Sequence, residues 1–215
     1  MIITEYECEV ISPMFLHGEN SNKVELRPIA IKSLMRFWWR ALNESLGEKL
    51  LEEEKKIFGG IGLTAYKSSF SIRISLKNYV ETTKSLTPHK NNNMKKAIQV
   101  GTKFNVIFYI NNNIQRKIEN IFEVSTVLGG LGMRARRAFG AIKILKKNKE
   151  NYEITGVESI YNLIEEVSEK EKFELNNNKI IYRNTEMIKN ETALKSIEII
   201  PKDKEIDYIL RKYHK

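Results

Sequence analysis

The sequence of 215 residues contains one cysteine, three histidines and no long hydrophobic run. A single cysteine, Cys8, excludes an internal disulfide and a cysteine-based metal site. No apolar run approaches the roughly 20 residues that a membrane-spanning helix requires. The N-terminal residues MIITEYECEV lack a basic region followed by a hydrophobic stretch, so no secretory signal is visible. We therefore expect a globular protein of the cytoplasm that needs no membrane, metal or cofactor.

Positive charge is abundant and unevenly distributed. The net charge is +9, but residues 1–149 carry 25 basic and 13 acidic side chains, whereas residues 150–215 carry 11 basic and 14 acidic ones. Between Leu128 and Lys149 there are seven basic residues and no acidic one. Solubility alone does not require this asymmetry, which is typical of a surface that binds a polyanion.

The densest motif is LGGLGMRARRAFGAIKI, which spans Leu128 to Ile144. It lacks the Gly-Lys-Ser/Thr of a phosphate-binding loop and the spacing of a dinucleotide-binding turn, and it follows a helix rather than opening one. Glycine permits positive φ and close approach to the main chain, and arginine suits phosphate oxygens. We expect an extended polyanion to bind here, through the candidate residues Gly129, Gly130, Gly132, Arg134, Arg136 and Arg137. The alternative is a glycine-rich turn with a solvated basic edge.

A helix is predicted from Ile31 to Leu46, with Pro28 at a position typical of a helix start. Its apolar stripe, which we expect in the core, comprises Ile31, Leu34, Met35, Trp38, Leu42 and Leu46. Lys32, Arg36 and Arg40 recur at every fourth position on the other side. Because like charges at this spacing repel one another, we interpret them as a phosphate-facing surface, with a plain solvated face as the alternative.

The remaining patterns complete a β-α-β-β-α-β order, which predicts an α+β, ferredoxin-like fold with the split βαβ arrangement. The predicted strands and helices, including a second short helix, are 3–12, 31–46, 48–58, 69–76, 103–110, 114–128 and 141–146. Residues 78–101 form a polar connection that is long enough to be a functional arm or disordered. We place one domain at 1–147 and a C-terminal extension at 148–215, in which only helices at 159–172 and 206–213 are indicated.

Three segments carry a resemblance to a known family: SPMFL from Ser12, RPIAIKSLMRFWWRAL from Arg27 and GGLGMRARRAFG from Gly129. Together they resemble the RAMP superfamily of CRISPR systems, and most of all the first-named subunits of type III-B Cmr effector complexes. The resemblance covers residues 1 to about 147. In the family loop the position of Ala138 is commonly glycine.

The resemblance implies a non-catalytic RNA-binding subunit of an RNA-guided antiviral complex, which holds the 3′ region of the guide RNA, target RNA, or both. Its implied partners are CRISPR guide RNA, target RNA and other RAMP subunits. We expect Arg27 to contact phosphate, and Lys32, Arg36 and Arg40 to converge on one groove with Arg134, Arg136 and Arg137. The main-chain N–H groups from Gly129 to Gly132 are expected to hold further phosphates. Trp39 or Phe37 is a candidate to stack on a base.

The alternative is a metal-independent endoribonuclease that processes precursor guide RNA. Such an enzyme needs a general base for the 2′-hydroxyl, and His17, beside Gly18, is the weak candidate. Metal catalysis has less support, because the consecutive Glu52, Glu53 and Glu54 cannot share one helical face. We interpret these three glutamates as a solvated helix surface.

Overall fold

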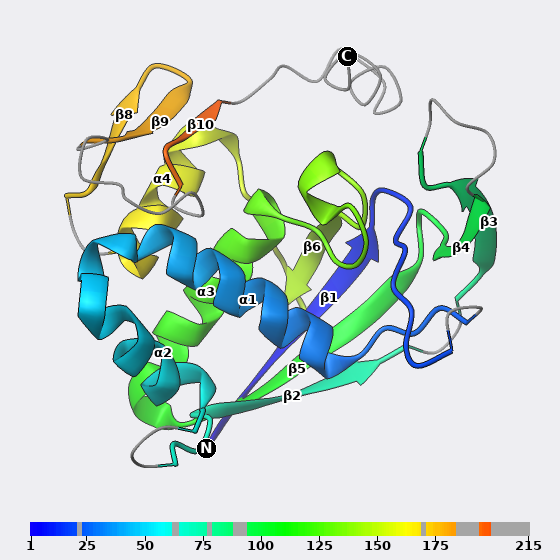
Figure 1. Cartoon of the computed structure of the whole chain (residues 1–215), viewed down its shortest axis with the longest axis horizontal. Helices are drawn as coiled ribbons and strands as arrows, with labels where there is room; N and C mark the ends of the chain where they lie inside the picture. The colour runs from blue at the N-terminus through cyan, green and yellow to red at the C-terminus, as the bar shows by residue number, and fades with distance from the viewer. Residues whose placement is uncertain are drawn as a thin grey trace.

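The computed structural model describes residues 1–20, 23–61, 65–76, 79–87, 94–168, 171–183 and 194–198. Figure 1 shows the helices and strands, coloured along the chain. In addition to the α-helices given below, 3-10 helices span Glu44–Lys49, Asn112–Ile114 and Ala135–Arg137. The helices and strands are β1 (Ile2–Val10), α1 (Pro28–Leu42), α2 (Leu50–Phe58), β2 (Phe70–Ser75), β3 (Glu81–Ser85), β4 (Met94–Ile98), β5 (Lys103–Ile110), α3 (Gln115–Leu128), β6 (Ile142–Lys147), β7 (Glu150–Asn151), α4 (Gly156–Val167), β8 (Phe173–Asn176), β9 (Lys179–Tyr182) and β10 (Ser196–Glu198). None of the helices in these ranges is long and apolar enough to cross a membrane.

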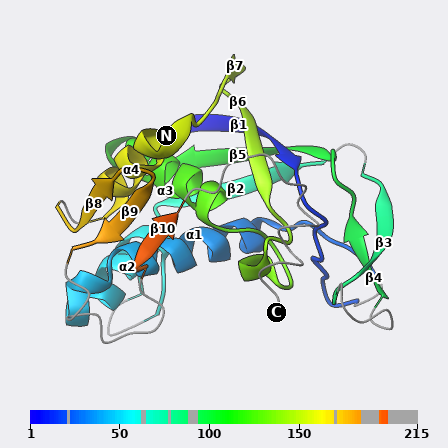
Figure 2. The ribbon, with the colours of Figure 1, turned by 90° about the horizontal axis from the view of Figure 1, so that it is seen from above.

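The main sheet has the strand order β2-β5-β1-β6-β7, and every pairing in it is antiparallel. The first strand is therefore central, between the third and fourth strands of the predicted β-α-β-β-α-β order. This is the split βαβ arrangement, so the predicted fold class is confirmed. Figure 2 shows the sheet as one layer with α1 and α3 on the same face.

Alternation in the strands decides which side chains enter the core. In β1, Thr4, Tyr6, Cys8 and Val10 are buried, while the intervening glutamates are partly exposed on the other face. Because side chains alternate across a strand, one face of the sheet is apolar and packs against the helices. The core so formed includes Phe108 of β5, Phe122 of α3 and Ile31 of α1.

The predicted first helix is too long at its C-terminal end. It ends at Leu42, where Asn43 donates a side-chain hydrogen bond to the Trp39 carbonyl at 2.8 Å and another to the Val167 carbonyl at 3.2 Å. An asparagine at a helix end satisfies carbonyls that the helix itself leaves unpaired. Asn43 thereby joins the ends of α1 and α4, a contact between residues far apart in the sequence.

The polar connection 78–101, for which no regular structure was predicted, is partly a β-hairpin. In β3 and β4, Lys84 lies directly opposite Lys95, and Lys96 forms a 2.8 Å ion pair with Glu81. Leu86 and Ala97 pack with Phe15 and Phe139 in a small second core. The described part of this connection is thus packed against the domain, and residues 78 and 88–93 lie outside the described residues.

The extension beyond residue 147 contains α4 and the antiparallel strands β8, β9 and β10. The predicted helix at 159–172 exists but is shifted to Gly156–Val167, and the strands were not predicted. Ile164, Val167, Phe173 and Ile180 belong to the same core cluster as the sheet. The predicted helix at 206–213 lies outside the described residues, and the division at residue 147 stays a prediction.

A buried polar network joins α3 to β1 and β6. Lys147 lies 2.8 Å from Glu123 and 2.9 Å from Glu119, and Tyr6 donates to Glu123 at 2.8 Å. Burial alone raises the pKa of Glu119, but hydrogen bonds from Lys147, Thr4 and Gln115 outweigh it and hold the pKa below its ordinary value. Burial alone lowers the pKa of Lys147, but its two carboxylate partners raise it. Lys147, one of the basic residues that follow Gly140 in the sequence, therefore has a structural role.

Candidate nucleic-acid interface

The basic residues of α1 are held by contacts inside the protein. Arg36 lies 2.9 Å from Glu54, donates to the carbonyl oxygens of Phe58 and Gly59, and stacks on the Phe58 ring. Arg40 binds both carboxylate oxygens of Glu54. The bond to Glu54 raises the pKa of Arg40. Both guanidinium groups are therefore directed at α2.

Lys32 is likewise occupied, because it donates to the Ser68 hydroxyl at 2.8 Å and lies over the Phe70 ring. Burial lowers its pKa, and the nearby charge of Arg36 lowers it further. Arg27, just before α1, is exposed and lies 3.9 Å from Glu25. The interpretation of Lys32 as part of an open phosphate-facing surface has no support in these contacts.

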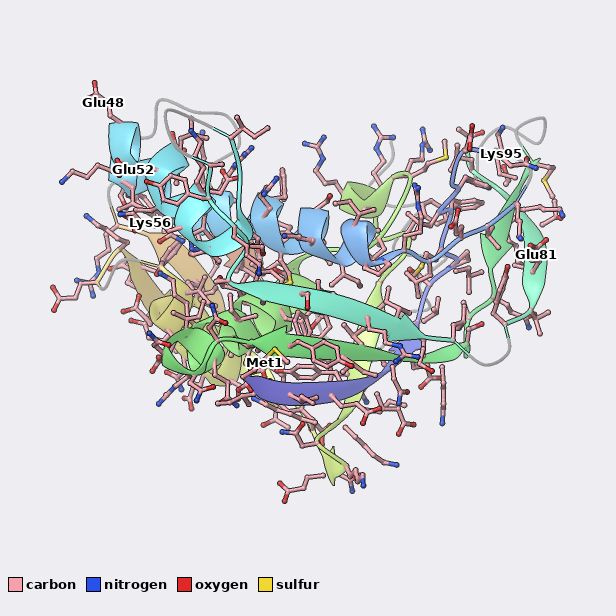
Figure 3. The ribbon with its side chains drawn as sticks, turned by 90° about the horizontal axis from the view of Figure 1, so that it is seen from below. Met1, Glu48, Glu52, Lys56, Glu81 and Lys95 are labelled. Carbon is pink, nitrogen blue, oxygen red and sulfur yellow. The ribbon has the colours of Figure 1, made fainter. Side chains whose placement is uncertain are left out.

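The interpretation of the three consecutive glutamates as a solvated helix surface is wrong for Glu54. It is 3% exposed and is the shared partner of Arg36 and Arg40, whereas Glu53 is partly exposed and pairs with Lys56 at 2.6 Å. Figure 3 shows Glu52 and Lys56 on α2 at the end of the molecule opposite Glu81 and Lys95 of the hairpin. No group of three or more acidic, histidine or cysteine side chains in the described ranges could hold a metal ion.

The glycine loop, defined here as residues 129–140, is built on close backbone contacts. Gly132 has φ +89°, and a Cβ there would lie 2.3 Å from the Phe15 carbonyl oxygen. Gly140 has φ +66°, and a Cβ there would overlap the Leu131 carbonyl oxygen. Only glycine fits such positions, because other residues meet steric clashes in the left-handed region. The loop is therefore fixed against the segment that follows β1.

The main-chain donors of this loop are partly used within the protein. The Gly129 N–H donates to the Ser125 carbonyl at 3.1 Å, and the Leu131 N–H donates to the Gly140 carbonyl at 2.8 Å. Met133 donates to the Phe15 carbonyl at 2.8 Å. The prediction that the run of N–H groups from Gly129 to Gly132 holds phosphates is therefore wrong for Gly129 and Leu131. Here the glycines mainly permit close packing.

The three arginines of the loop have different surroundings. Arg134 adopts φ +57° and donates to the Leu86 carbonyl at 2.9 Å, so it joins the loop to the hairpin. Arg136 and Arg137 are exposed, and within the described part of the chain no carboxylate pairs with either. Arg136 lies over the Phe37 ring of α1, with its guanidinium carbon 5.9 Å from the ring centroid. These two arginines are available to an external anion.

A groove of about 350 Å³ separates the glycine loop from α1. Its α1 wall contains Ala30, Ser33, Phe37 and Trp38, and its loop wall runs from Gly129 to Gly132 and includes Arg136. Among the described residues that line it, none is acidic. Lys32, Arg36 and Arg40 lie on a different face of α1, so the predicted convergence of all six basic side chains on one groove is wrong. Figure 1 shows α2 and the glycine loop on different sides of α1.

The two tryptophans exchange their predicted positions. Trp39 is 1% exposed and packs against Phe58, so it is a core residue rather than a base-stacking candidate. Trp38, which was assigned to the core, is half-buried and lines the groove beside Phe37. A signal for this existed in the sequence: Ala30, Ser33, Leu34, Phe37 and Trp38 follow helical spacing and place two small residues beside two aromatic ones.

His17 has no geometry that favours catalysis. It lies in the segment after β1, forms an isolated antiparallel bridge with Val24, and is half-buried. Its Nε2 atom is buried and has no hydrogen-bond partner among the described residues. A general base must be within hydrogen-bond reach of the proton that it removes, which a buried nitrogen is not in this conformation.

The sequence is similar to a family model and to two named proteins. A family model described as the RAMP superfamily matches residues 7–143. The chain is 26% identical over 196 residues to a Pyrococcus furiosus protein named CRISPR system Cmr subunit Cmr1-1, covering 80% of this chain and 56% of the relative. It is 27% identical over 177 residues to Cmr1-2 of the same organism, covering 65% of this chain and 93% of the relative. The chain thus spans little more than half the length of the first of these relatives.

Solved structures share the fold. Cmr1 from Pyrococcus furiosus in its apo form matches with a TM-score of 0.53 and 23% identity, over 78% of this chain and 58% of that one. A chain of the Type III-B Cmr-beta complex bound to cognate target RNA matches with a TM-score of 0.50 and 16% identity, over 68% of this chain and 59% of that one. A chain of a Type IV-B CRISPR complex matches with a TM-score of 0.52 and 12% identity, over 72% of this chain and 93% of that one.

Proposed function

The chain belongs to the RAMP superfamily, and from this premise we propose that it is a non-catalytic RNA-binding subunit of a type III-B CRISPR effector complex. It holds guide RNA, target RNA or both through the sugar-phosphate chain. The observation that carries the proposal is the pair Arg136 and Arg137, exposed on a glycine loop whose backbone is fixed by glycines at close contacts. Similarity to two Cmr subunits supports the kind of complex.

Rigid presentation is what distinguishes these arginines from ordinary surface charges. The loop is anchored on one side by the bond from Met133 to Phe15 and on the other by Arg134, which holds Leu86 of the hairpin. Lys84 and Lys95 face each other on that hairpin, although like charges opposite each other destabilise a strand pair. A polyanion bound across the loop and the hairpin would offset this repulsion, which favours RNA over an uncharged ligand.

Salt-dependent binding of a single-stranded RNA tests the proposal. Arg136→Ala/Arg137→Ala should weaken binding and reduce the slope of log K against log salt concentration by roughly 1.4, about 0.7 for each lost phosphate contact on a single strand. The matched control is Lys103→Ala/Lys143→Ala, which removes the same charge from exposed positions on the open face of the sheet. The proposal fails if the control pair reduces affinity and slope more than the loop pair does.

A repeat RNA tests the absence of catalysis. We expect it to be recovered at full length after incubation with the wild-type protein, with or without a chelator. Cleavage of a repeat RNA that persists in chelator and disappears in His17→Ala would establish the endoribonuclease instead.

A further inference from the structure

We propose that the groove between α1 and the glycine loop receives one unstacked nucleobase of the bound RNA strand. This inference rests on the proposed function, because it assigns a base subsite beside the phosphate-binding arginines. Ligand sites are concave, largely apolar and roughly 300 to 1,000 Å³ in volume. At about 350 Å³ this groove is at the small end of that range, suited to a single base rather than to a longer segment.

The aromatic wall of the groove is held in place before any ligand arrives. Phe37 and Trp38 pack edge to face, with ring centroids 5.2 Å apart and planes at 86°. The Trp38 indole lies against Gly129, where a Cβ would be 2.2 Å from Nε1. Because these rings are already ordered, stacking of a base on them costs little side-chain entropy.

The rim of the groove decides which ligand fits. An apolar side chain of a protein partner would match the volume, but it would gain nothing from the charge of Arg136 at the edge of the groove. A nucleotide unit satisfies both parts, with the base against the rings and the phosphate at the arginines. Arg136 already lies over the Phe37 ring, so its guanidinium group can also stack on an inserted base.

The experiment compares a short single-stranded RNA with the same strand carrying abasic ribose units, using Trp38→Leu and Phe37→Leu. Both replacements keep an apolar side chain and remove the ring. Each should weaken binding of the ordinary RNA by roughly 5- to 100-fold, leave the salt slope unchanged, and have no effect on the abasic strand. The matched control is Tyr109→Leu, which removes a half-buried aromatic ring from β5 on the open face of the sheet. This control should bind both strands as the wild type does.

The outcomes separate this inference from the proposed function. If the wild type binds RNA with the arginine-dependent salt slope but neither ring replacement matters, the nucleobase subsite is wrong and the proposed function stands. If binding to the effector complex is lost in Trp38→Leu while RNA affinity is kept, the groove holds a protein side chain and the inference is also wrong. If the wild type binds no RNA at low salt, both proposals fail. Phe37→Leu provides an independent answer should Trp38→Leu not fold.

Discussion

On α1, Lys32, Arg36 and Arg40 each have partners within the protein, whereas on the glycine loop Arg136 and Arg137 face solvent without a described carboxylate partner. Both sets looked equally basic along the chain. For Arg36 and Arg40 the difference is due to one residue, Glu54 of α2, whose carboxylate pairs with both guanidinium groups. Lys32 is held instead by Ser68 and the Phe70 ring. A run of like charges thus indicates a binding surface only after the chain's own carboxylates have been placed around it.

The strongest test of this comparison is removal of Glu54. Glu54→Gln keeps the side-chain volume but leaves Arg36 and Arg40 without a counter-charge. We expect the free energy of unfolding to fall by about 2 to 3 kcal/mol, below the full cost of breaking a buried pair because both arginines are partly exposed. Urea denaturation measures this. Glu53→Gln, the neighbouring change at the exposed pair with Lys56, should leave the free energy of unfolding almost unchanged.

The RNA affinity of folded Glu54→Gln should equal that of the wild type. A gain in affinity would show that Arg36 and Arg40 are RNA contacts that Glu54 masks, and the contrast between the clusters would then be wrong.

The second test concerns the rigidity of the loop. Gly132→Ala places a Cβ 2.3 Å from the Phe15 carbonyl oxygen at φ +89°, while Gly47→Ala has φ +54° and nothing within 4 Å. Both changes carry left-handed strain, but only the first adds a clash with the backbone. We expect Gly132→Ala to lower the free energy of unfolding by about 2 kcal/mol more than Gly47→Ala does.

RNA affinity should also decrease in Gly132→Ala and remain unchanged in Gly47→Ala, because only the first displaces the loop arginines. Equal affinity for both variants would mean that the geometry of the loop is irrelevant to binding.

Lys147 is a third basic residue that pairs with carboxylates inside the protein. Its network predicts that the stability of the fold depends on pH. The folded state holds the pKa of Glu119 below the ordinary value of 4.5, so its contribution is present above that pH and is lost as the pH falls through the lowered pKa. The wild type should therefore lose stability on acidification faster than Glu119→Gln. Denaturation at a series of acidic pH values measures the difference. Parallel curves would show that this carboxylate is not coupled to folding.

The smallest effect is expected at Ala138, which adopts φ +62° in the glycine loop. An alanine in the left-handed region is strained, so Ala138→Gly should raise the free energy of unfolding by up to about 1 kcal/mol. Ala135 lies in the same loop, but its φ is not positive. Ala135→Gly should therefore lower the free energy of unfolding by about 0.5 to 1 kcal/mol. Thermal denaturation of both variants checks the opposite signs.

The fold was predictable because it depends on local periodicity. Alternation in β1 and β5 and the apolar stripes of α1 and α3 each follow from burial of one face, and their order permits few topologies. The hairpin β3–β4 was missed because its sequence is mostly polar, and its position depends on contacts such as that of Arg134 with Leu86. The strands after residue 170 were missed because each is only three or four residues long, too short for a clear pattern.

The sequence by itself determined the split βαβ order, the excess of positive charge in the first 149 residues and the need for glycine in the loop. The tertiary structure alone decided which cations are free, because charge pairing depends on distances between α1, α2 and the loop that no local pattern encodes. It also decided that Trp38 rather than Trp39 faces the groove. On a helix a shift of one residue turns a side chain by about 100°, and only packing against β2 and α3 fixes that angle.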